Sequence, residues 1–206
     1  MEIDRIQRIG LMGGSFNPIH YGHLCLAREA YRQKKLDRIL FLPCGTPYRK
    51  KRIYMASGAD RLHMTELAVK GYPQFAVSDM EIRRGGNTYT CDTLRQLVRE
   101  NSGCSYYFIA GADCLFSVEN WKRPDVIFEN CIFLVGMRNG ANPEGMCRKK
   151  AELEKIFGAR IEILSFPDIP VSSTLIRERI KHGENIRYLV PESVRNYMEE
   201  KHIYTE

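Results

Sequence analysis

The sequence predicts an α/β fold: a doubly wound parallel sheet covered by helices on both faces, with a small helical part at the C-terminal end. Three observations predict it. Short apolar, β-branched runs alternate with longer segments whose apolar residues recur at helical spacing. Several of the apolar runs end in glycine or proline. No linker or internal repeat interrupts the 206 residues, so one domain is expected over 1–206, with 172–206 as its C-terminal helical part.

Six apolar runs are expected to be the strands of that sheet. They are short and rich in Ile, Leu, Val and Phe, and they lack the alternation of polar residues seen in half-exposed strands. Strands of a parallel sheet are buried on both faces, which favours such continuous apolar runs. The expected strands are 8–12, 38–42, 75–78, 106–110, 131–135 and 161–165.

Six further segments are expected to be helices. Ser57 and Asp60 form a capping-box pattern before one of them, and Thr90 stands where an N-cap of another is expected. The basic segment 46–52 is expected to be a loop. The expected helices are 22–35, 61–70, 90–100, 144–157, 173–182 and 191–201.

The chain is mildly basic, with a net charge of +6 and a sequence pI near 8.9. A polyanionic ligand such as a nucleotide would explain this charge, as would RNA or a solubilising surface, and charge alone leaves these readings open. The N-terminal residues do not form a signal peptide, and no run approaches the roughly 18 to 20 apolar residues that span a bilayer. We therefore expect no membrane partner.

The seven cysteines are scattered and contain no Cys-x-x-Cys pair. An odd, unpatterned set of cysteines among apolar residues is typical of a reducing compartment rather than of a disulfide framework or a zinc site. The sequence therefore predicts a cytoplasmic protein without a metal site built from its own side chains.

The segment GGSFNPIHYGHL at 13–24 lies between the first expected strand and the first expected helix. Gly13 and Gly14 lack a Cβ, so their backbone can approach a ligand closely, and amides at a helix N-terminus favour an anion. His20 and His23 are three residues apart and share a face if they lie in the first helical turn. A single histidine or glycine pair is more often structural, but their combination in one strand-to-helix loop indicates a phosphate site.

Such a site suits nucleotidyl transfer. The attacking group in that reaction is an ionised phosphate, so no general base is required. The protein aligns the reactants and neutralises charge that grows on the phosphates, which histidine N–H groups can do by donating hydrogen bonds. Two histidines at this spacing could also ligate a metal, but the sequence offers no third ligand nearby.

A second segment, VSSTLIRERI at 171–180, has the same character. Ser172 and its two neighbours can cap a helix, and Arg177 follows one turn later. Hydroxyls, amides and a guanidinium then point at one spot, which suits a triphosphate. Taken alone, this pattern would be read as a plain N-cap followed by a surface arginine. Beside the first segment, it indicates a second part of one phosphate site.

These two segments resemble the H-x-G-H and (I/V)-S-S-T-x-x-R segments of the nucleotidyltransferase superfamily, and the first is similar to that of bacterial nicotinate-nucleotide adenylyltransferases. The resemblance runs along nearly the whole chain and implies one nucleotidyltransferase domain with a Rossmann-like fold. It also implies these contacts to ATP: Gly13, Gly14, Ser15, Phe16, His20, His23, Gly111, Asp113, Ser172, Thr174 and Arg177.

Further segments resemble the acceptor side of the same family. PCGTPYRK at 43–50 resembles a loop that usually ends in Pro-His-Lys or Pro-His-Arg, and it keeps Lys50 but has Tyr48 and Arg49 in place of the Pro-His pair. The only tryptophan follows the I-x-G-x-D pattern, and Lys122 stands where the family more often has an aromatic residue. The resemblance implies these contacts to a pyridine nucleotide: Asn17, Lys50, Thr90, Trp121 and Arg138.

The implied reaction joins nicotinate mononucleotide and ATP to give nicotinate adenine dinucleotide and pyrophosphate. His20, His23, Lys50 and Arg177 are its expected catalytic residues, and Mg²⁺ is expected to bridge the ATP phosphates without a dedicated protein cage. The partners are then small molecules and no nucleic acid. The oligomeric state is left open, a homo-oligomer included. Alternatives are the same chemistry on nicotinamide mononucleotide or phosphopantetheine, or a non-catalytic nucleotide or RNA sensor.

Overall fold

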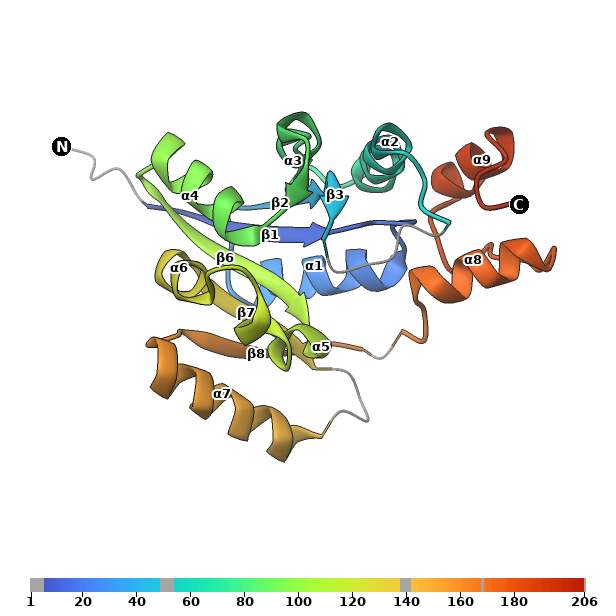
Figure 1. Cartoon of the computed structure of the whole chain (residues 1–206). Coiled ribbons are helices and arrows are strands. Elements are labelled where there is room, and N and C mark those ends of the chain that lie inside the picture. Colours follow the sequence, from blue (N-terminus) through green and yellow to red (C-terminus); the bar gives the residue numbers. More distant parts are fainter. Residues whose placement is uncertain (1–5, 49–53, 138–141, 168, 206) are drawn as a thin grey trace. The chain divides into compact units, whose positions relative to one another are not determined.

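The protein is described from a computed structural model, in which residues 6–48, 54–137, 142–167 and 169–205 are described (Figure 1). The chain forms two compact units, each assembled from three segments. The first unit contains Met1–Gly13, Leu26–Leu40 and Tyr89–Asp168, and the second contains Gly14–Cys25, Phe41–Thr88 and Ile169–Glu206. The sequence predicts one domain, which stays a prediction.

The first unit is built on parallel strands. β1 (Gln7–Gly14) pairs with β6 (Cys104–Gly111), β6 with β7 (Ile132–Met137), and β7 with β8 (Ile161–Ser165). The register places Leu11 opposite Phe108 and Val135 opposite Ile163. These strands carry fully buried apolar side chains, which form the core of the unit: Leu11, Ile109, Phe133, Leu134 and Val135.

Helices follow each of these strands in the sequence. α1 (Tyr21–Gln33) follows β1 and contributes residues to both units. α4 (Thr90–Glu100) precedes β6. α5 (Ala112–Leu115), a 3₁₀ turn η1 (Val118–Asn120) and α6 (Pro124–Asn130) lead to β7, and α7 (Pro143–Phe157) leads to β8.

The second unit carries short strands and four helices among its described residues. Its strands are β3 (Thr46–Pro47), β4 (Phe75–Val77) and β5 (Asn87–Thr88), and β2 (Arg38–Pro43) is shared with the first unit. Its helices are α2 (Gly58–Val69), α3 (Met80–Arg84), α8 (Ser173–Lys181) and α9 (Glu192–Glu200).

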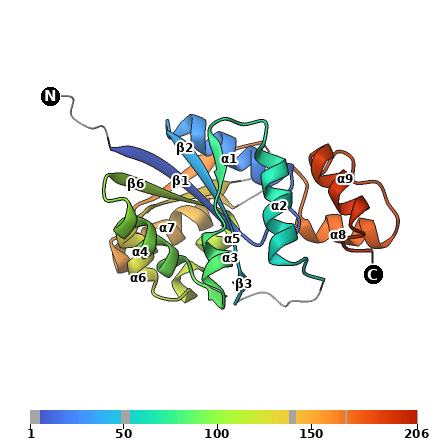
Figure 2. The same ribbon diagram turned by 90° about the horizontal axis from the view of Figure 1, so that it is seen from above.

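Helices α2 and α9 lie side by side in the second unit (Figure 2). The Ser193 hydroxyl donates to the Leu67 carbonyl at 3.3 Å, and the Tyr197 hydroxyl donates to Oδ1 of Asp60 at 2.8 Å. The predicted C-terminal helices therefore pack into the same compact unit as the segment 14–25.

The large sheet has six strands in the order β4-β2-β1-β6-β7-β8. From β1 the chain moves outward through β2 and β4 and then returns to place β6 on the other side of β1. The direction of winding therefore reverses between β1 and β6, and ligands of open α/β sheets bind beyond the carboxyl ends of the strands at such a reversal. The predicted fold class, a parallel sheet with flanking helices, is confirmed.

The six expected strands and six expected helices are confirmed, with small shifts at their ends. Two expectations were wrong: Thr46 and Pro47 form β3 with β5 rather than a loop, and Thr90 is the first helical residue after an N-cap at Tyr89. The short elements α3, α5, η1 and α6 were not expected. Elements of three to seven residues are too short for a period of 3.6 to be recognised.

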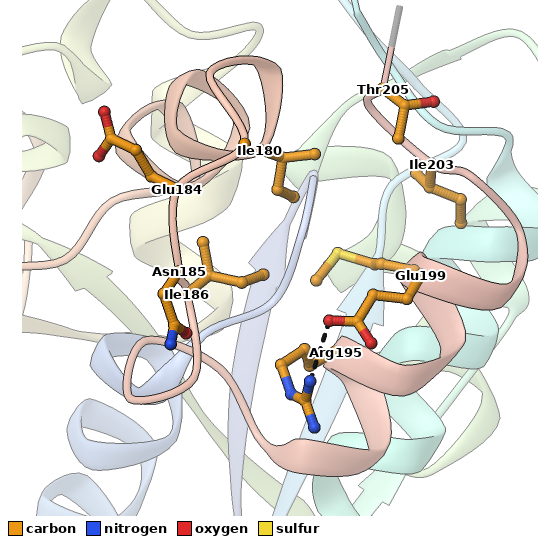
Figure 3. Close-up of a pocket in the computed structure, with 10 residues that line it drawn as sticks. Ile180, Glu184, Asn185, Ile186, Arg195, Glu199, Ile203 and Thr205 are labelled. Carbon is orange, nitrogen blue, oxygen red and sulfur yellow. Dashed lines mark hydrogen bonds and ion pairs between the residues drawn. The ribbon is translucent and has the colours of Figure 1, made fainter.

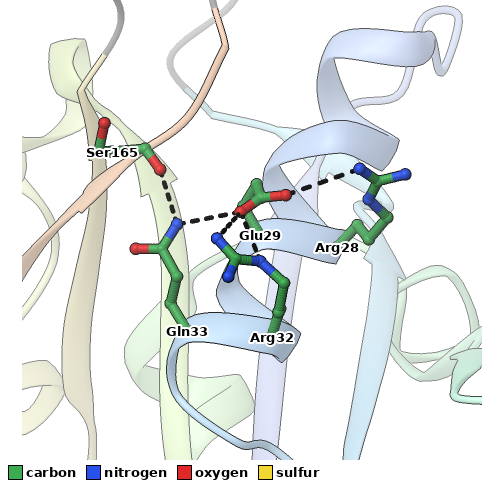
Figure 4. A network of polar contacts seen from close by, with 5 residues as sticks. All are labelled: Arg28, Glu29, Arg32, Gln33 and Ser165. Carbon is green, nitrogen blue, oxygen red and sulfur yellow. Dashed lines mark hydrogen bonds and ion pairs between the residues drawn. The ribbon is translucent and has the colours of Figure 1, made fainter.

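A buried carboxylate ties α1 to the end of β8 in the first unit (Figure 4). Oε2 of Glu29 accepts from Nη2 of Arg32 at 2.8 Å and from Nε2 of Gln33 at 3.1 Å. The same Gln33 amide donates to the Ser165 carbonyl at 2.7 Å. Hydrogen bonds from Arg32 first, and then from Gln33, hold the pKa of Glu29 below its ordinary value.

No helix in the described part of the chain is long and apolar enough to cross a membrane.

Candidate functional site

The loop between β1 and α1 has an unusual backbone. Phe16 is almost fully buried and adopts φ = 44°, a region that a bulky side chain rarely enters. Asn17 and His20 are both only 4% exposed. The loop is therefore held from inside the second unit rather than draped over its surface, which gives any ligand contact along it a fixed geometry.

His20 and His23 lie against each other as the sequence predicts. Their rings are stacked with centroids 3.7 Å apart and planes 26° apart. The His20 carbonyl accepts from the His23 amide at 2.9 Å, which starts α1, and the His20 amide donates to Nδ1 of His23 at 3.3 Å. Because Nδ1 of His23 accepts, the proton of its neutral ring is on Nε2, which can donate to a ligand.

Gly22 allows this stacking. A Cβ at this position would lie 3.0 Å from Nδ1 of His20 and 3.0 Å from Cγ1 of Val171. Both distances are tighter than ordinary van der Waals contact, so the absence of a side chain lets Val171 pack beside the histidine pair. The glycine thus joins the two predicted segments as well as separating the two histidines.

The second predicted segment meets the first within the second unit. Nη1 of Arg177 donates to the Asn17 carbonyl at 2.7 Å, and the Ser173 hydroxyl donates to the Pro18 carbonyl at 2.9 Å. Nη2 of Arg177 also contacts Oγ1 of Thr174 at 3.3 Å. The guanidinium therefore lies beside the histidine loop, with further N–H groups left for a ligand.

Ser172 is the N-cap of α8, as expected. Its Oγ accepts from the Leu175 amide at 3.1 Å. The hydroxyl proton is not used in this contact, so Ser172 can cap the helix and still donate to a phosphate oxygen. Whether Ser172 and Thr174 contact ATP stays a prediction.

Asn17 is more deeply engaged than a plain ligand contact would require. Its Oδ1 accepts from the Ala56 amide at 2.9 Å and from the Tyr204 hydroxyl at 2.6 Å. Its Nδ2 donates to the Tyr54 carbonyl at 3.0 Å. One amide hydrogen remains, so the predicted contact of Asn17 with the pyridine nucleotide stays a prediction.

Arg61 is a residue of this region that sequence reasoning missed. It is 1% exposed, and its Nη1 donates to the Ser15 carbonyl at 2.8 Å. Its Nη2 donates to the Gly45 carbonyl at 2.8 Å and its Nε to the Ala56 carbonyl at 3.2 Å. The signal was its place on the buried face of α2 with Met64, Thr65 and Ala68.

Other predicted ATP contacts lie in the first unit, at the carboxyl ends of β1 and β6. Gly111 ends β6 and precedes α5, and a Cβ there would lie 2.7 Å from Oδ1 of Asp113. The glycine therefore lets the exposed Asp113 carboxylate fold back beside the strand end. Gly13 lies near the end of the neighbouring strand β1, so both glycines lie where the winding of the sheet reverses.

Trp121 and Thr90 are the described candidates for the pyridine ring and its carboxylate. The half-buried Trp121 packs edge-on against Phe108 and Phe133, with ring centroids 6.0 and 6.3 Å away. Thr90 is the first residue of α4, where backbone amides favour an anion. Both are in the first unit, and their roles stay predictions.

Lys122 departs from the family pattern and is held beside the same helix. Its Nζ lies 3.0 Å from Oδ2 of Asp92, in the first turn of α4, and 4.1 Å from the centroid of the Tyr89 ring. The hydrogen bond from Lys122 to Asp92 raises the pKa of the lysine. The ammonium charge is therefore shared with a carboxylate at the helix N-terminus.

Lys50 and Arg138, the remaining predicted contacts, lie outside the described residues. Within the described part, no group of three or more His, Cys, Asp or Glu side chains is placed to hold a metal ion. The donors around the histidine loop are N–H and hydroxyl groups, a set that binds phosphate oxygens.

Two of the cavities in the second unit are lined in part by residues of α8. One, of about 250 Å³, is lined by Arg177 and Thr174 together with Tyr54, Glu178, Lys181 and Tyr204. The other, of about 380 Å³, lies between α8 and α9 and has Arg195 and Glu199 paired at 2.9 Å on its wall (Figure 3). None of the predicted site residues lines the second cavity.

The chain matches the family model described as cytidylyltransferase-like over residues 11–179. It is 44% identical over 193 residues to a probable nicotinate-nucleotide adenylyltransferase of Lachnoclostridium phytofermentans, covering 94% of this chain and 96% of that protein. It is 42% identical over 197 residues to a protein of the same description from Geobacillus kaustophilus, covering 96% of this chain and 86% of that protein.

Solved structures are similar as well. The nicotinic acid mononucleotide adenylyltransferase of Plasmodium falciparum complexed with NaAD superimposes with a TM-score of 0.79 and covers 96% of this chain and 97% of that one. The two sequences are 17% identical, so this likeness shows the fold alone.

Proposed function

This chain belongs to the cytidylyltransferase-like family and, within it, to the nicotinate-nucleotide adenylyltransferases, and from that premise we propose that it joins nicotinate mononucleotide to the AMP part of ATP. The observation that carries the proposal is local. Arg177 donates a hydrogen bond of 2.7 Å to the Asn17 carbonyl, in the segment that carries the stacked histidines. A guanidinium held against the loop that carries two imidazoles supplies the donors that a transferring phosphate needs.

The reaction needs no proton to be removed from the nucleophile. An oxygen of the mononucleotide phosphate attacks the α-phosphorus of ATP, a new P–O bond forms, and the bond to the β-phosphate oxygen breaks to release pyrophosphate. Negative charge moves onto the leaving oxygen in this step. His23, through Nε2, and His20 donate to the phosphate oxygens, and Arg177 neutralises the leaving pyrophosphate.

The remaining residues are assigned from the segments that resemble this family. Backbone amides of Gly13, Gly14, Ser15 and Phe16 face the phosphates, helped by the hydroxyls of Ser172 and Thr174. Gly111 and Asp113 receive the adenosine, the carboxylate accepting from ribose hydroxyls. Asn17, Lys50, Thr90, Trp121 and Arg138 receive the pyridine nucleotide.

Magnesium fits this donor set as a companion of the nucleotide. The histidine loop and Arg177 offer N–H groups rather than carboxylates, so Mg²⁺ would be held mainly by the substrate and water, with these N–H groups binding phosphate oxygens. When bound, Mg²⁺ neutralises phosphate charge and aligns the chain of phosphates. The seven cysteines are present as thiols rather than as disulfides, which supports a place in the reducing cytoplasm.

The acceptor is tested by turnover. Purified protein is supplied with ATP and Mg²⁺ and with one of three acceptors: nicotinate mononucleotide, nicotinamide mononucleotide or phosphopantetheine. Pyrophosphate release is followed, and the adenylylated product is identified by mass. We expect the highest kcat/KM with nicotinate mononucleotide. A tenfold or greater preference for phosphopantetheine would overturn the proposal.

A non-catalytic sensor on the same fold would bind ATP and release no pyrophosphate. His20→Ala distinguishes the two functions, because the loss of one donor to a developing charge lowers kcat by about 10²–10³-fold. His63→Ala is the matched control, since His63 is exposed on α2 and pairs only with surface groups among its described contacts. Wild-type protein that binds ATP without turnover would favour the sensor.

A further inference from the structure

We propose that Tyr204, near the C-terminal end of the chain, is a positioning residue for the transfer: its hydroxyl fixes the Asn17 carboxamide and, through Asn17, the loop that carries the histidines and receives Arg177. The inference rests on the proposed function. Neither the sequence motifs nor the family resemblance points to this tyrosine, which lies 187 residues from Asn17 along the chain.

Hydrogen bonds fix the orientation of the Asn17 side chain. Oδ1 receives two hydrogen bonds, at 2.6 Å from the Tyr204 hydroxyl and at 2.9 Å from the Ala56 amide. A backbone amide can only donate, so a flipped carboxamide would place Nδ2 against another donor. At 4% exposure, Asn17 has no solvent to replace a lost partner. The carboxamide therefore has one satisfied orientation, and Tyr204 supplies one of its bonds.

The tyrosine is in the right protonation state to donate. Burial raises the pKa of Tyr204 above its ordinary value, so its hydroxyl keeps its proton across the neutral range. The hydroxyl lies in the same unit as Arg177, and both side chains line the cavity of about 250 Å³. Tyr204 therefore lines the same cavity as Arg177, which is assigned to the pyrophosphate. We assign Tyr204 itself no contact with the pyrophosphate.

The backbone around Asn17 contains several residues in an unfavourable conformation. Among the described residues, six that are not glycine have positive φ, and three of them are the chain neighbour Phe16 at 44° and two hydrogen-bond partners of the Asn17 side chain, Tyr54 at 54° and Tyr204 at 70°. Steric contact of Cβ disfavours this region for aromatic residues, so such conformations persist only where surrounding contacts impose them. Asn17 is hydrogen-bonded to two of these residues, to the Tyr54 carbonyl and to the Tyr204 hydroxyl.

The backbone of Asn17 and Pro18 connects this side chain to Arg177 and the histidine pair. The Asn17 carbonyl accepts from Arg177 at 2.7 Å, and Pro18 accepts from Ser173 at 2.9 Å. His20 follows two residues after Pro18. A change in the Asn17 side chain therefore moves the carbonyl that aims Arg177 and the start of the turn that carries the histidine pair.

The test compares two tyrosines of the same C-terminal segment. Tyr204→Phe removes the hydrogen bond to Asn17, and Tyr197→Phe removes a hydroxyl hydrogen bond of 2.8 Å to Asp60 that does not involve Asn17. With ATP, Mg²⁺ and nicotinate mononucleotide, we expect Tyr204→Phe to lower kcat/KM for ATP about tenfold, mostly through kcat. Tyr197→Phe should stay within twofold of wild type. Equal losses in the two variants would overturn the proposal.

A double-mutant cycle tests the route through Asn17. If Tyr204 acts through that side chain, Tyr204→Phe should cause less than a twofold further loss of kcat in an Asn17→Ala background. Losses that multiply in the double variant would mean that Tyr204 acts independently of Asn17, and the proposal would fail.

A readout without turnover separates this proposal from the proposed function. The Ala56 amide donates to Asn17, so its hydrogen exchange, followed by NMR without substrate, should speed up in Tyr204→Phe and not in Tyr197→Phe. Unchanged exchange at Ala56 in Tyr204→Phe would refute the contact. A wild-type protein that forms no dinucleotide would refute the proposed function, while the exchange result would still decide the contact.

Discussion

His23 shows how one backbone contact selects the useful atom of a side chain. The His20 amide donates to Nδ1 of His23 at 3.3 Å, so the proton of the neutral ring is on Nε2. The centroids of the buried Phe16 ring and the His23 ring are 5.1 Å apart with their planes 83° apart, and this packing limits rotation of the His23 ring. The residue is therefore preorganised as a donor, which is what stabilisation of a developing charge requires.

Replacing His23 by each of two amides tests this assignment. The side-chain nitrogen of Gln can reach the place of Nε2, whereas that of Asn reaches only the place of Nδ1. We expect His23→Gln to retain more kcat than His23→Asn, with His23→Asn reduced about 10²–10³-fold. Steady-state kinetics with saturating ATP measures the difference. The reverse order would mean that Nδ1 is the functional atom.

Arg61 shows a different use of charge at a single residue. Its guanidinium is buried, and its described partners are the carbonyls of Ser15, Gly45 and Ala56 and the sulfur of Cys44, at 3.8 Å. Carbonyl dipoles satisfy the N–H groups but leave a full positive charge below the loop. That charge favours anions near Ser15.

Among the elements, α8 carries much of the candidate site on its first turn. Ser172 caps the helix, Ser173 bonds the histidine loop, and Arg177 lies one turn along. The cap sets where the helix begins and therefore where Arg177 points. The same cap chemistry occurs on α2, where Ser57 accepts from the Asp60 amide at 3.1 Å.

These two caps form a matched pair for mutation. Ser172→Ala and Ser57→Ala should each lower the free energy of unfolding by about 1 kcal/mol, because each leaves a helix amide without its acceptor. Only Ser172→Ala should also raise KM for ATP. Chemical denaturation and steady-state kinetics give the two quantities. Equal kinetic effects of the two variants would contradict a role of Ser172 at the phosphates.

The stability that α1 gives the protein depends on pH because of Glu29. The pKa of Glu29 is held below its ordinary 4.5, so its contribution to stability is present above that pH and is lost as pH falls through the lower value of the folded state. Glu29→Gln should therefore lower the free energy of unfolding at pH 7 by about 1.5–3 kcal/mol, the range for hydrogen bonds to a charged group. The difference should shrink below pH 4.5.

Denaturation at several pH values measures this effect. Glu192→Gln is the control, because the Glu192 side chain is 75% exposed and exposed ion pairs contribute little. A stability difference for Glu29→Gln that stays constant down to pH 3 would show that the carboxylate charge is not what stabilises the helix.

At the scale of the whole molecule, the reactivity of a cysteine depends on whether it lies in a core or at the surface. Cys131 is 1% exposed in the first unit, and its thiol donates to the Ile127 carbonyl at 3.2 Å. Burial raises the pKa of Cys131 to about 12. Cys147, on α7 of the same unit, is exposed.

Alkylation of the native protein at pH 8 should therefore modify Cys147 quickly. Cys131 should react at least about 10³-fold more slowly, because it needs an opening of the core. Peptide mass mapping over time measures both rates, and both cysteines should react alike in denaturant. Fast labelling of Cys131 in the native protein would contradict the packing described here.

The sequence by itself determined the longer strands and helices and predicted the chemistry of the loops. Strands and helices follow from local periods of apolar residues, and the histidine and Ser-Thr-Arg segments are recognisable because their residues are neighbours in the chain. Long-range contacts were decided only by the tertiary structure. Arg177 donates to the Asn17 carbonyl across 160 positions, and the Tyr204 hydroxyl donates to the Asn17 side chain across 187 positions. The buried Arg61 donates to the Ser15 carbonyl across 46 positions. No local pattern specifies such a partner, because it depends on how the elements pack once each has formed.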